Sequence, residues 1–214
     1  MIVVNFKNYA FGNRLLYLVK LVEKFCKEAI ICVPSTEINR LVRETRLQIF
    51  AQHFDYKKTP LSTGFVTAEA IKKAGAKGSL LNHSEHPIRY ETIKEMIKTS
   101  NKLSLKIILC SSSLKETKKL IRLRPFAVAY EEPNLIGKGI SITSRKERKI
   151  KEFASLFQKT NVKFLCGAGI SNKEDIVNAF KLGCDGVLIS SAIANSLTPE
   201  KFLSEISNKK FTII

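Results

Sequence analysis

Short apolar runs alternate with longer amphipathic segments eight times along this chain of 214 residues. This alternation is typical of a parallel sheet whose strands are joined by crossover helices. We predict strands at Ile2–Lys7, Ala29–Pro34, Leu47–Gln52, Gly78–His83, Leu105–Cys110, Phe126–Glu131, Val162–Cys166 and Gly186–Ile189. We predict helices at Arg14–Lys27, Glu37–Arg43, Ala68–Ala74, Ile88–Thr99, Leu114–Leu123, Lys146–Gln158, Asn172–Leu182 and Pro199–Ser207. Eight strands, each followed by a helix, indicate a (β/α)8 barrel.

An open, doubly wound sheet also alternates strands and helices, but it usually has a glycine-rich first turn. The first predicted turn reads VNFKNYAFG and lacks the GxGxxG pattern. Since no low-complexity or Pro/Ser-rich linker interrupts the chain, we expect a single domain over residues 1–214. The chain is shorter than the ~250 residues typical of such barrels, so its loops must be brief.

Composition limits the location and the partners of the protein. The start, MIVVNFKNY, does not resemble a signal peptide, and no apolar run approaches the ~18 residues of a membrane helix. We therefore expect a cytoplasmic protein with no membrane contact. The five cysteines lack CxxC spacing, which predicts buried free thiols and no metal site. The net charge of +17 leaves nucleic-acid binding open, although lysines dispersed over predicted helices favour a solvated surface.

Polar residues stand where predicted strands end, which is where barrel enzymes place their chemistry. The first strand ends with Asn5 and Lys7, which share one face because side chains alternate. The fourth ends at His83, and the sixth ends in the two acids Glu131 and Glu132. Taken alone, Lys7 also fits a solvated loop, and the two acids also fit a surface turn.

Two turns of small residues follow the last two strands. The segments are CGAGIS at 166–171 and ISSA at 189–192. Backbone amides in such turns approach a phosphate closely, and a following helix directs its positive end toward the anion. Paired turns at these positions predict a phosphate-binding site.

The motifs VNFKNY, LLNHSE, YEEPNLIGKG, LCGAGI and GVLISSA occur in this order over nearly the whole chain. Together they resemble the triosephosphate isomerase family. AQHFD, LLNHSE and LCGAGI look like its compact archaeal branch. The resemblance implies a TIM barrel that interconverts dihydroxyacetone phosphate and D-glyceraldehyde 3-phosphate in glycolysis and gluconeogenesis, without a cofactor.

The resemblance also implies a role for each candidate residue. Glu131 matches the base that moves a proton between adjacent carbons, and His83 matches the electrophile that polarises the carbonyl. Lys7 matches the lysine that stabilises the enediolate, Asn5 matches a substrate-contacting amide, and Glu85 matches a carboxylate that pairs with the lysine. Phosphate contacts carried over from the family are Ile136, Gly137, Gly169, Ser190 and Ser191.

Three positions depart from the family pattern. Glu132 stands where the first hinge of the active-site lid usually has proline, which adds a like charge beside the expected base. Lys138 replaces a small residue in the lid. His86 follows NHSE where the family commonly has arginine, which puts an ion pair in doubt but leaves the chemistry intact.

Assembly and alternatives complete the prediction. Members of the family are dimers and the archaeal branch forms tetramers, so we expect a homotetramer, or else a homodimer. Thr63-Gly64 resembles the tip of the loop that reaches into a neighbouring subunit.

The alternatives to an active triosephosphate isomerase are another phosphate-binding barrel enzyme, a basic nucleic-acid-binding protein on a barrel scaffold, or an inactive isomerase.

Overall fold

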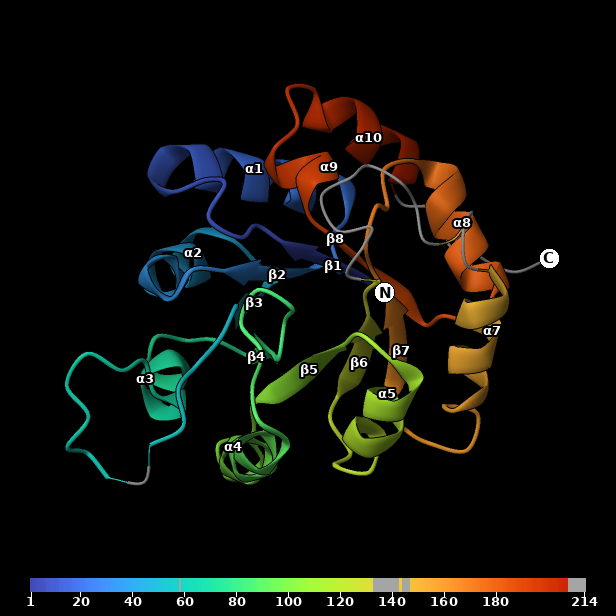
Figure 1. Ribbon diagram of the computed structural model, residues 1–214. Helices are drawn as coiled ribbons and strands as arrows, with labels where there is room; N and C mark the ends of the chain where they lie inside the picture. The colour runs from blue at the N-terminus through green and yellow to red at the C-terminus, as the bar shows by residue number, and fades with distance from the viewer. Residues whose placement is uncertain (58, 133–142, 144–146, 208–214) are drawn as a thin grey trace.

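The computed structural model describes residues 1–57, 59–132, 143 and 147–207, and its strands close into a barrel (Figure 1). All neighbouring strands are parallel and pair in chain order, and β1 pairs with β8 to close the ring. The strands are β1 (Ile2–Asn5), β2 (Ile30–Val33), β3 (Gln48–Ala51), β4 (Gly78–Leu81), β5 (Lys106–Ser111), β6 (Ala127–Tyr130), β7 (Lys163–Cys166) and β8 (Gly186–Ile189). The predicted (β/α)8 TIM barrel is confirmed.

Helices surround the barrel and connect its strands (Figure 1). Each predicted helix overlaps an observed one, with ends that shift by a few residues. Within the described residues, two short elements, the 3-10 turn η1 and the four-residue helix α9, were not predicted because neither is long enough to show a periodic apolar pattern. The helices are α1 (Gly12–Phe25), η1 (Ser35–Glu37), α2 (Ile38–Glu44), α3 (Ala68–Lys73), α4 (Tyr90–Lys102), α5 (Leu114–Ile121), α7 (Glu147–Ser155), α8 (Lys173–Lys181), α9 (Ser191–Ala194) and α10 (Pro199–Ile206).

Alternation along the strands separates two apolar layers. In β6, Ala127 and Ala129 face the inside of the barrel, whereas Val128 and Tyr130 face the surrounding helices. The inner layer consists of Val3, Ile30, Cys32, Phe50, Leu80, Ile108, Cys110, Ala127, Ala129, Leu165 and Leu188. Because side chains fill the inside, no channel runs through the barrel, and a bound molecule must lie at one of its ends.

The prediction of buried free thiols is confirmed: all five cysteines are buried and none forms a disulfide. Burial raises the pKa of the Cys26 thiol to about 11, so this group stays protonated near neutral pH. Across the described ranges, no helix combines the length and the apolar character needed to cross a membrane.

Candidate active site

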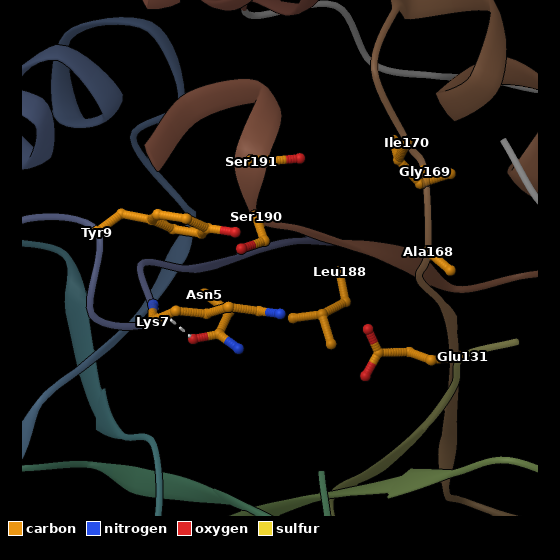
Figure 2. Close-up of a pocket in the computed structure, with 10 residues that line it drawn as sticks. All are labelled: Asn5, Lys7, Tyr9, Glu131, Ala168, Gly169, Ile170, Leu188, Ser190 and Ser191. Atoms are coloured by element: carbon orange, nitrogen blue, oxygen red, sulfur yellow. Dashed lines mark hydrogen bonds between the residues drawn. The ribbon is translucent and has the colours of Figure 1, made fainter. Parts of the chain in front are cut away.

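A cavity opens at the end of the barrel where the strands finish (Figure 2). Figure 2 shows the side chains of Lys7 and Glu131 pointing into it from opposite sides, with Ser190 and Ser191 above them. The cavity is lined by Asn5, Lys7, Tyr9, Glu131, Ala168, Gly169, Ile170, Leu188, Ser190 and Ser191. Six of these residues, from four strand ends, are among the predicted site residues.

Glu131 follows β6 and directs its carboxylate into the cavity (Figure 2). Its position follows from alternation, because Ala127 and Ala129 of the same strand also face inward. The Glu131 N–H donates to the carbonyl of Ser111 on β5 at 3.0 Å. Gly167 leaves room for the side chain, since a Cβ at that position would lie 2.9 Å from Cγ of Glu131. Glu131 is buried, which suits a carboxylate that must work away from bulk water.

His83 lies next to Glu131, although the two come from different strands. The backbone of Asn82 has a φ of +59°, which interrupts the alternation after β4 and turns the following side chain inward. The amide of Asn82 holds this turn by donating to the carbonyl of Cys110 at 3.0 Å and accepting from the N–H of Ile88 at 2.9 Å. The buried His83 ring then places Nε2 3.3 Å from Oε2 of Glu131, without the angles of a hydrogen bond.

The protonation of His83 follows from its hydrogen bond to the backbone. Nδ1 accepts from the N–H of Glu85 at 3.1 Å, so it carries no proton and the proton of the neutral ring is on Nε2. The Glu85 carboxylate lies 3.7 Å from the same Nδ1, which would be a charge pair only with a protonated ring. The hydrogen bond from the backbone argues for the neutral form. The site therefore presents an N–H donor beside a carboxylate.

Lys7 supplies a cation to the cavity. Its ammonium lies 2.5 Å from Oε1 of Glu85, and its side chain is 16% exposed, whereas that of Glu85 is 58% exposed. The Lys7 backbone has a φ of +45°, and its N–H donates to Oδ1 of Asn5 at 3.0 Å (Figure 2). Gln52 donates to the Lys7 carbonyl at 2.9 Å. The backbone of Lys7 is thus held on both sides, and its amine extends across the cavity.

The predicted phosphate contacts divide into two groups. Gly169, Ser190 and Ser191 line the cavity together. Within the part of the chain that the structure describes, the buried Oγ of Ser190 has no hydrogen-bond partner, so a bound anion has a donor available there. Ile136 and Gly137 lie outside the described residues, as does Lys138.

Glu132 turns away from the cavity. Its carboxylate accepts from the Tyr130 hydroxyl at 2.7 Å and from the Lys149 ammonium at 2.8 Å. The ammonium compensates the negative charge that the sequence places beside Glu131. His86 stacks its ring on that of His53 at 3.9 Å, so the position where the family commonly has arginine makes an aromatic contact here.

Two residues that line the cavity, Tyr9 and Leu188, were not predicted, and two more, Ala168 and Ile170, lie in the predicted phosphate turn at 166–171 without having been named individually. Leu188 could have been found, because alternation along β8 places it on the same face as Ser190. Tyr9, Ala168 and Ile170 belong to irregular segments whose direction no periodicity predicts. Among the described side chains, no group of three His, Cys, Asp or Glu residues could hold a metal ion.

Comparison with known proteins agrees with this arrangement. The sequence model of the triosephosphate isomerase family matches residues 1–209. The chain belongs to the triosephosphate isomerase family. The predicted resemblance and the prediction of an isomerase are thereby confirmed.

Relatives and solved structures support the same assignment. The triosephosphate isomerase of Metallosphaera sedula is 39% identical, over 97% of this chain and 94% of that protein. That of Methanocaldococcus jannaschii is 34% identical, over 96% and 98% respectively. The crystal structure of the Bartonella henselae triosephosphate isomerase has a TM-score of 0.71 at 18% identity and covers 95% of both chains, which shows the shared fold. As predicted, these two relatives from Metallosphaera sedula and Methanocaldococcus jannaschii are archaeal.

Proposed function

We propose that this chain interconverts dihydroxyacetone phosphate and D-glyceraldehyde 3-phosphate through an enediolate, a step of glycolysis and gluconeogenesis. The observation that carries the proposal is the pair formed by Glu131 and His83. A buried carboxylate lies 3.3 Å from the Nε2 of a neutral ring, in a site that also contains an ammonium group. A base, a donor to the developing oxyanion and a cation are what proton transfer beside a carbonyl requires.

In this mechanism, Glu131 is the base. Its carboxylate removes a proton from C1 of dihydroxyacetone phosphate, and the C–H electrons form the C1–C2 double bond while negative charge develops on O2. The Nε2–H of His83 donates to that oxygen, and the Lys7 ammonium stabilises the charge. His83 then moves a proton from the C1 hydroxyl to O2: its Nε2–H protonates O2 and the ring takes up the proton of the C1 hydroxyl, so the negative charge passes to O1. The electron pair on O1 forms the aldehyde C=O while the C1–C2 double bond takes the proton back from Glu131 at C2. No cofactor takes part.

The phosphate of the substrate acts as a binding handle. We assign it to Gly169, Ser190 and Ser191, together with Ile136 and Gly137, and we assign Asn5 to the substrate's polar end near Lys7. The unpartnered Oγ of Ser190 supports this assignment, because a buried hydroxyl without an acceptor costs free energy that a bound anion recovers. Binding energy at the phosphate also fixes the carbon skeleton against Glu131 and His83.

A coupled assay of glyceraldehyde 3-phosphate isomerisation tests the proposal. Glu131→Gln should lower kcat by about 10²–10⁴-fold, and His83→Ala by about 10²–10³-fold. Glu91→Gln changes an exposed carboxylate on α4 and should keep the parental kcat. Parental turnover in the Glu131→Gln variant would contradict the assignment of the base.

We also propose a homotetramer, with a homodimer as the alternative, formed by one-domain subunits in the cytoplasm. The segment between β3 and α3 supports assembly, because Leu61 is 93% and Phe65 47% exposed beside Thr63-Gly64. A stable, fully active monomer in sedimentation would refute the assembly.

The alternative functions gain no support. No structural observation or comparison favours nucleic-acid binding through the net charge of +17, or the activity of another phosphate-binding barrel enzyme.

A further inference from the structure

Side chains on either side of Glu131 point away from the cavity. Tyr130 precedes it on β6, is fully buried in the outer apolar layer, and stacks on Phe153 of α7 with ring centroids 3.8 Å apart. Glu132 follows it and reaches the same outer side, where it contacts Lys149 of α7. The inward Glu131 therefore lies between two residues that are anchored to the helix outside the barrel.

These outer residues meet at one atom. The Tyr130 hydroxyl donates to Oε2 of Glu132 at 2.7 Å, and the Lys149 ammonium donates to the same oxygen at 2.8 Å. The Lys149 ammonium also lies 5.3 Å from the centre of the Tyr130 ring. The Glu132 side chain is only 12% exposed and that of Lys149 is 36% exposed, so the carboxylate is shielded from water while the ammonium stays partly solvated. We call Tyr130, Glu132 and Lys149 the outer clamp.

The tyrosine and the lysine of the outer clamp keep their protons near neutral pH. Burial, followed by the contact with Glu132, raises the pKa of Tyr130 to about 12, although Lys149 opposes this. Burial lowers the pKa of Lys149, but hydrogen bonds to Glu132 and Tyr130 outweigh it and leave that pKa raised. The phenol therefore remains a donor and the amine remains a cation.

We propose that the outer clamp positions the carboxylate of Glu131 for proton transfer, an inference that rests on the proposed role of Glu131 as the base. Backbone hydrogen bonds already fix this segment laterally, from Glu131 N–H to Ser111 on β5 at 3.0 Å and from Gly167 N–H to Tyr130 at 2.8 Å. The outer clamp adds a third anchor, directed toward α7. Three anchors in different directions restrict both the position and the rotation of the Glu131 backbone.

Stability alone is a weak reason for such an arrangement. Removing water from a carboxylate and an ammonium costs free energy that their attraction only partly recovers, so a well-packed apolar pair would often be as stable. Fixed geometry is what the ionic arrangement supplies. Since misplacement of a reacting group by ~1 Å can cost ~10²-fold in rate, a small displacement of Glu131 is sufficient to be measured.

The test compares variants of the complete chain in the isomerisation assay, each expressed relative to a parent that is first shown to turn over substrate. Tyr130→Phe removes one hydroxyl and retains the stacking on Phe153, and Lys149→Met removes the cation. Each should lower kcat by about 10-fold while KM changes less than twofold. The fall in kcat of the double variant should be about the same as that of either single variant, because both substitutions act through Glu132. Lys149→Arg should restore most of the activity.

A matched control separates positioning from general stability. Lys98→Met removes a helical ammonium that lies 2.6 Å from Glu95 on α4, and it should lower neither kcat nor KM. Parental kcat in both Tyr130→Phe and Lys149→Met would overturn the inference, whatever their melting temperatures. A positioning role predicts a lower kcat while the acidic limb of the pH–rate profile stays in place. A loss of activity caused by a shift of that limb would therefore also overturn the inference. Absence of turnover in the parent would instead refute the proposed function.

Discussion

Gly167→Ala tests how closely the site is fitted around Glu131. The new Cβ would lie 2.9 Å from Cγ of Glu131, 3.1 Å from Oε1 and 3.3 Å from Cδ. Relaxed carbon contacts are about 3.5–4.0 Å, so the carboxylate must retreat by about 0.6–1.1 Å. A shift of ~1 Å costs up to ~10²-fold in rate, which corresponds to about 2.7 kcal/mol of activation free energy. We expect kcat to fall by about 10–100-fold.

Stability should change much less than activity in this variant. The backbone of Gly167 lies outside the left-handed region, so alanine is compatible with it, and the substitution reduces the entropy of the unfolded chain. The clash falls on a side chain at the edge of a cavity, which can move without repacking the barrel. We therefore expect the free energy of unfolding to stay within about 1–2 kcal/mol of the parent.

The coupled isomerisation assay gives kcat and KM, and urea titration gives the free energy of unfolding. Gly183→Ala is the matched control, because it makes the same chemical change before β8, at the opposite end of the barrel. There, a φ of +94° and an Ala154 Cβ at 3.1 Å should lower stability while kcat remains parental. If Gly167→Ala retained kcat within threefold of the parent, the reasoning about the fit of Glu131 would be wrong.

Three further predictions concern the rest of the chain. Asn172→Ala removes the side chain that caps α8 by accepting from Asp175 N–H at 2.8 Å, and should lower the free energy of unfolding by about 1 kcal/mol in urea titrations. Burial and the neighbouring His86 lower the pKa of His53 below its ordinary 6.5. The unfolded chain therefore binds more protons below about pH 6.5, and stability falls as pH drops through this window. His53→Asn should flatten that fall between pH 7.5 and 5.5, and an unchanged slope would contradict the assignment. Ellman's reagent should label almost no thiol in the folded protein and five after denaturation, since every cysteine is buried.

The sequence predicted the barrel because its signal is local and repeated. Each apolar run is short and bounded by polar, glycine or proline residues, and all eight runs overlap observed strands. The ends were less accurate: the run Phe126–Glu131 becomes β6 at Ala127–Tyr130, because the registers with β5 and β7 both end at Tyr130, although the Glu131 N–H still donates to Ser111 on β5. Chain order also predicted which residues would meet, since all strands finish at one end of a parallel barrel.

Side-chain contacts between residues far apart in the chain could not be predicted from the sequence. Lys149 lies 17 residues after Glu132, in a helix that also contains Arg148 and Lys151, and no spacing rule distinguishes it from these neighbours. The stacking of His53 on His86 joins the segments after β3 and β4 and likewise has no local signal. Both arise where the family pattern is interrupted. Residues that depart from the family pattern therefore mark positions with unusual contacts, but only the packing shows which contacts these residues make.

Backbone conformation after β1, β4 and β7 explains why the ends of these strands, more than their middles, shape the site. Lys7, Asn82 and Ala168 are non-glycine residues with φ of +45°, +59° and +72°, and they follow β1, β4 and β7. A left-handed residue of this kind costs about 1–2 kcal/mol. Ser104 and Arg124, which precede β5 and β6, bear the same cost, so a role at the site has to be argued from contacts. At Asn82 that role is visible, because the reversal turns His83 toward Glu131 and the Asn82 amide stabilises it through hydrogen bonds. Regular alternation alone would direct His83 outward, so the site depends on the strands ending irregularly.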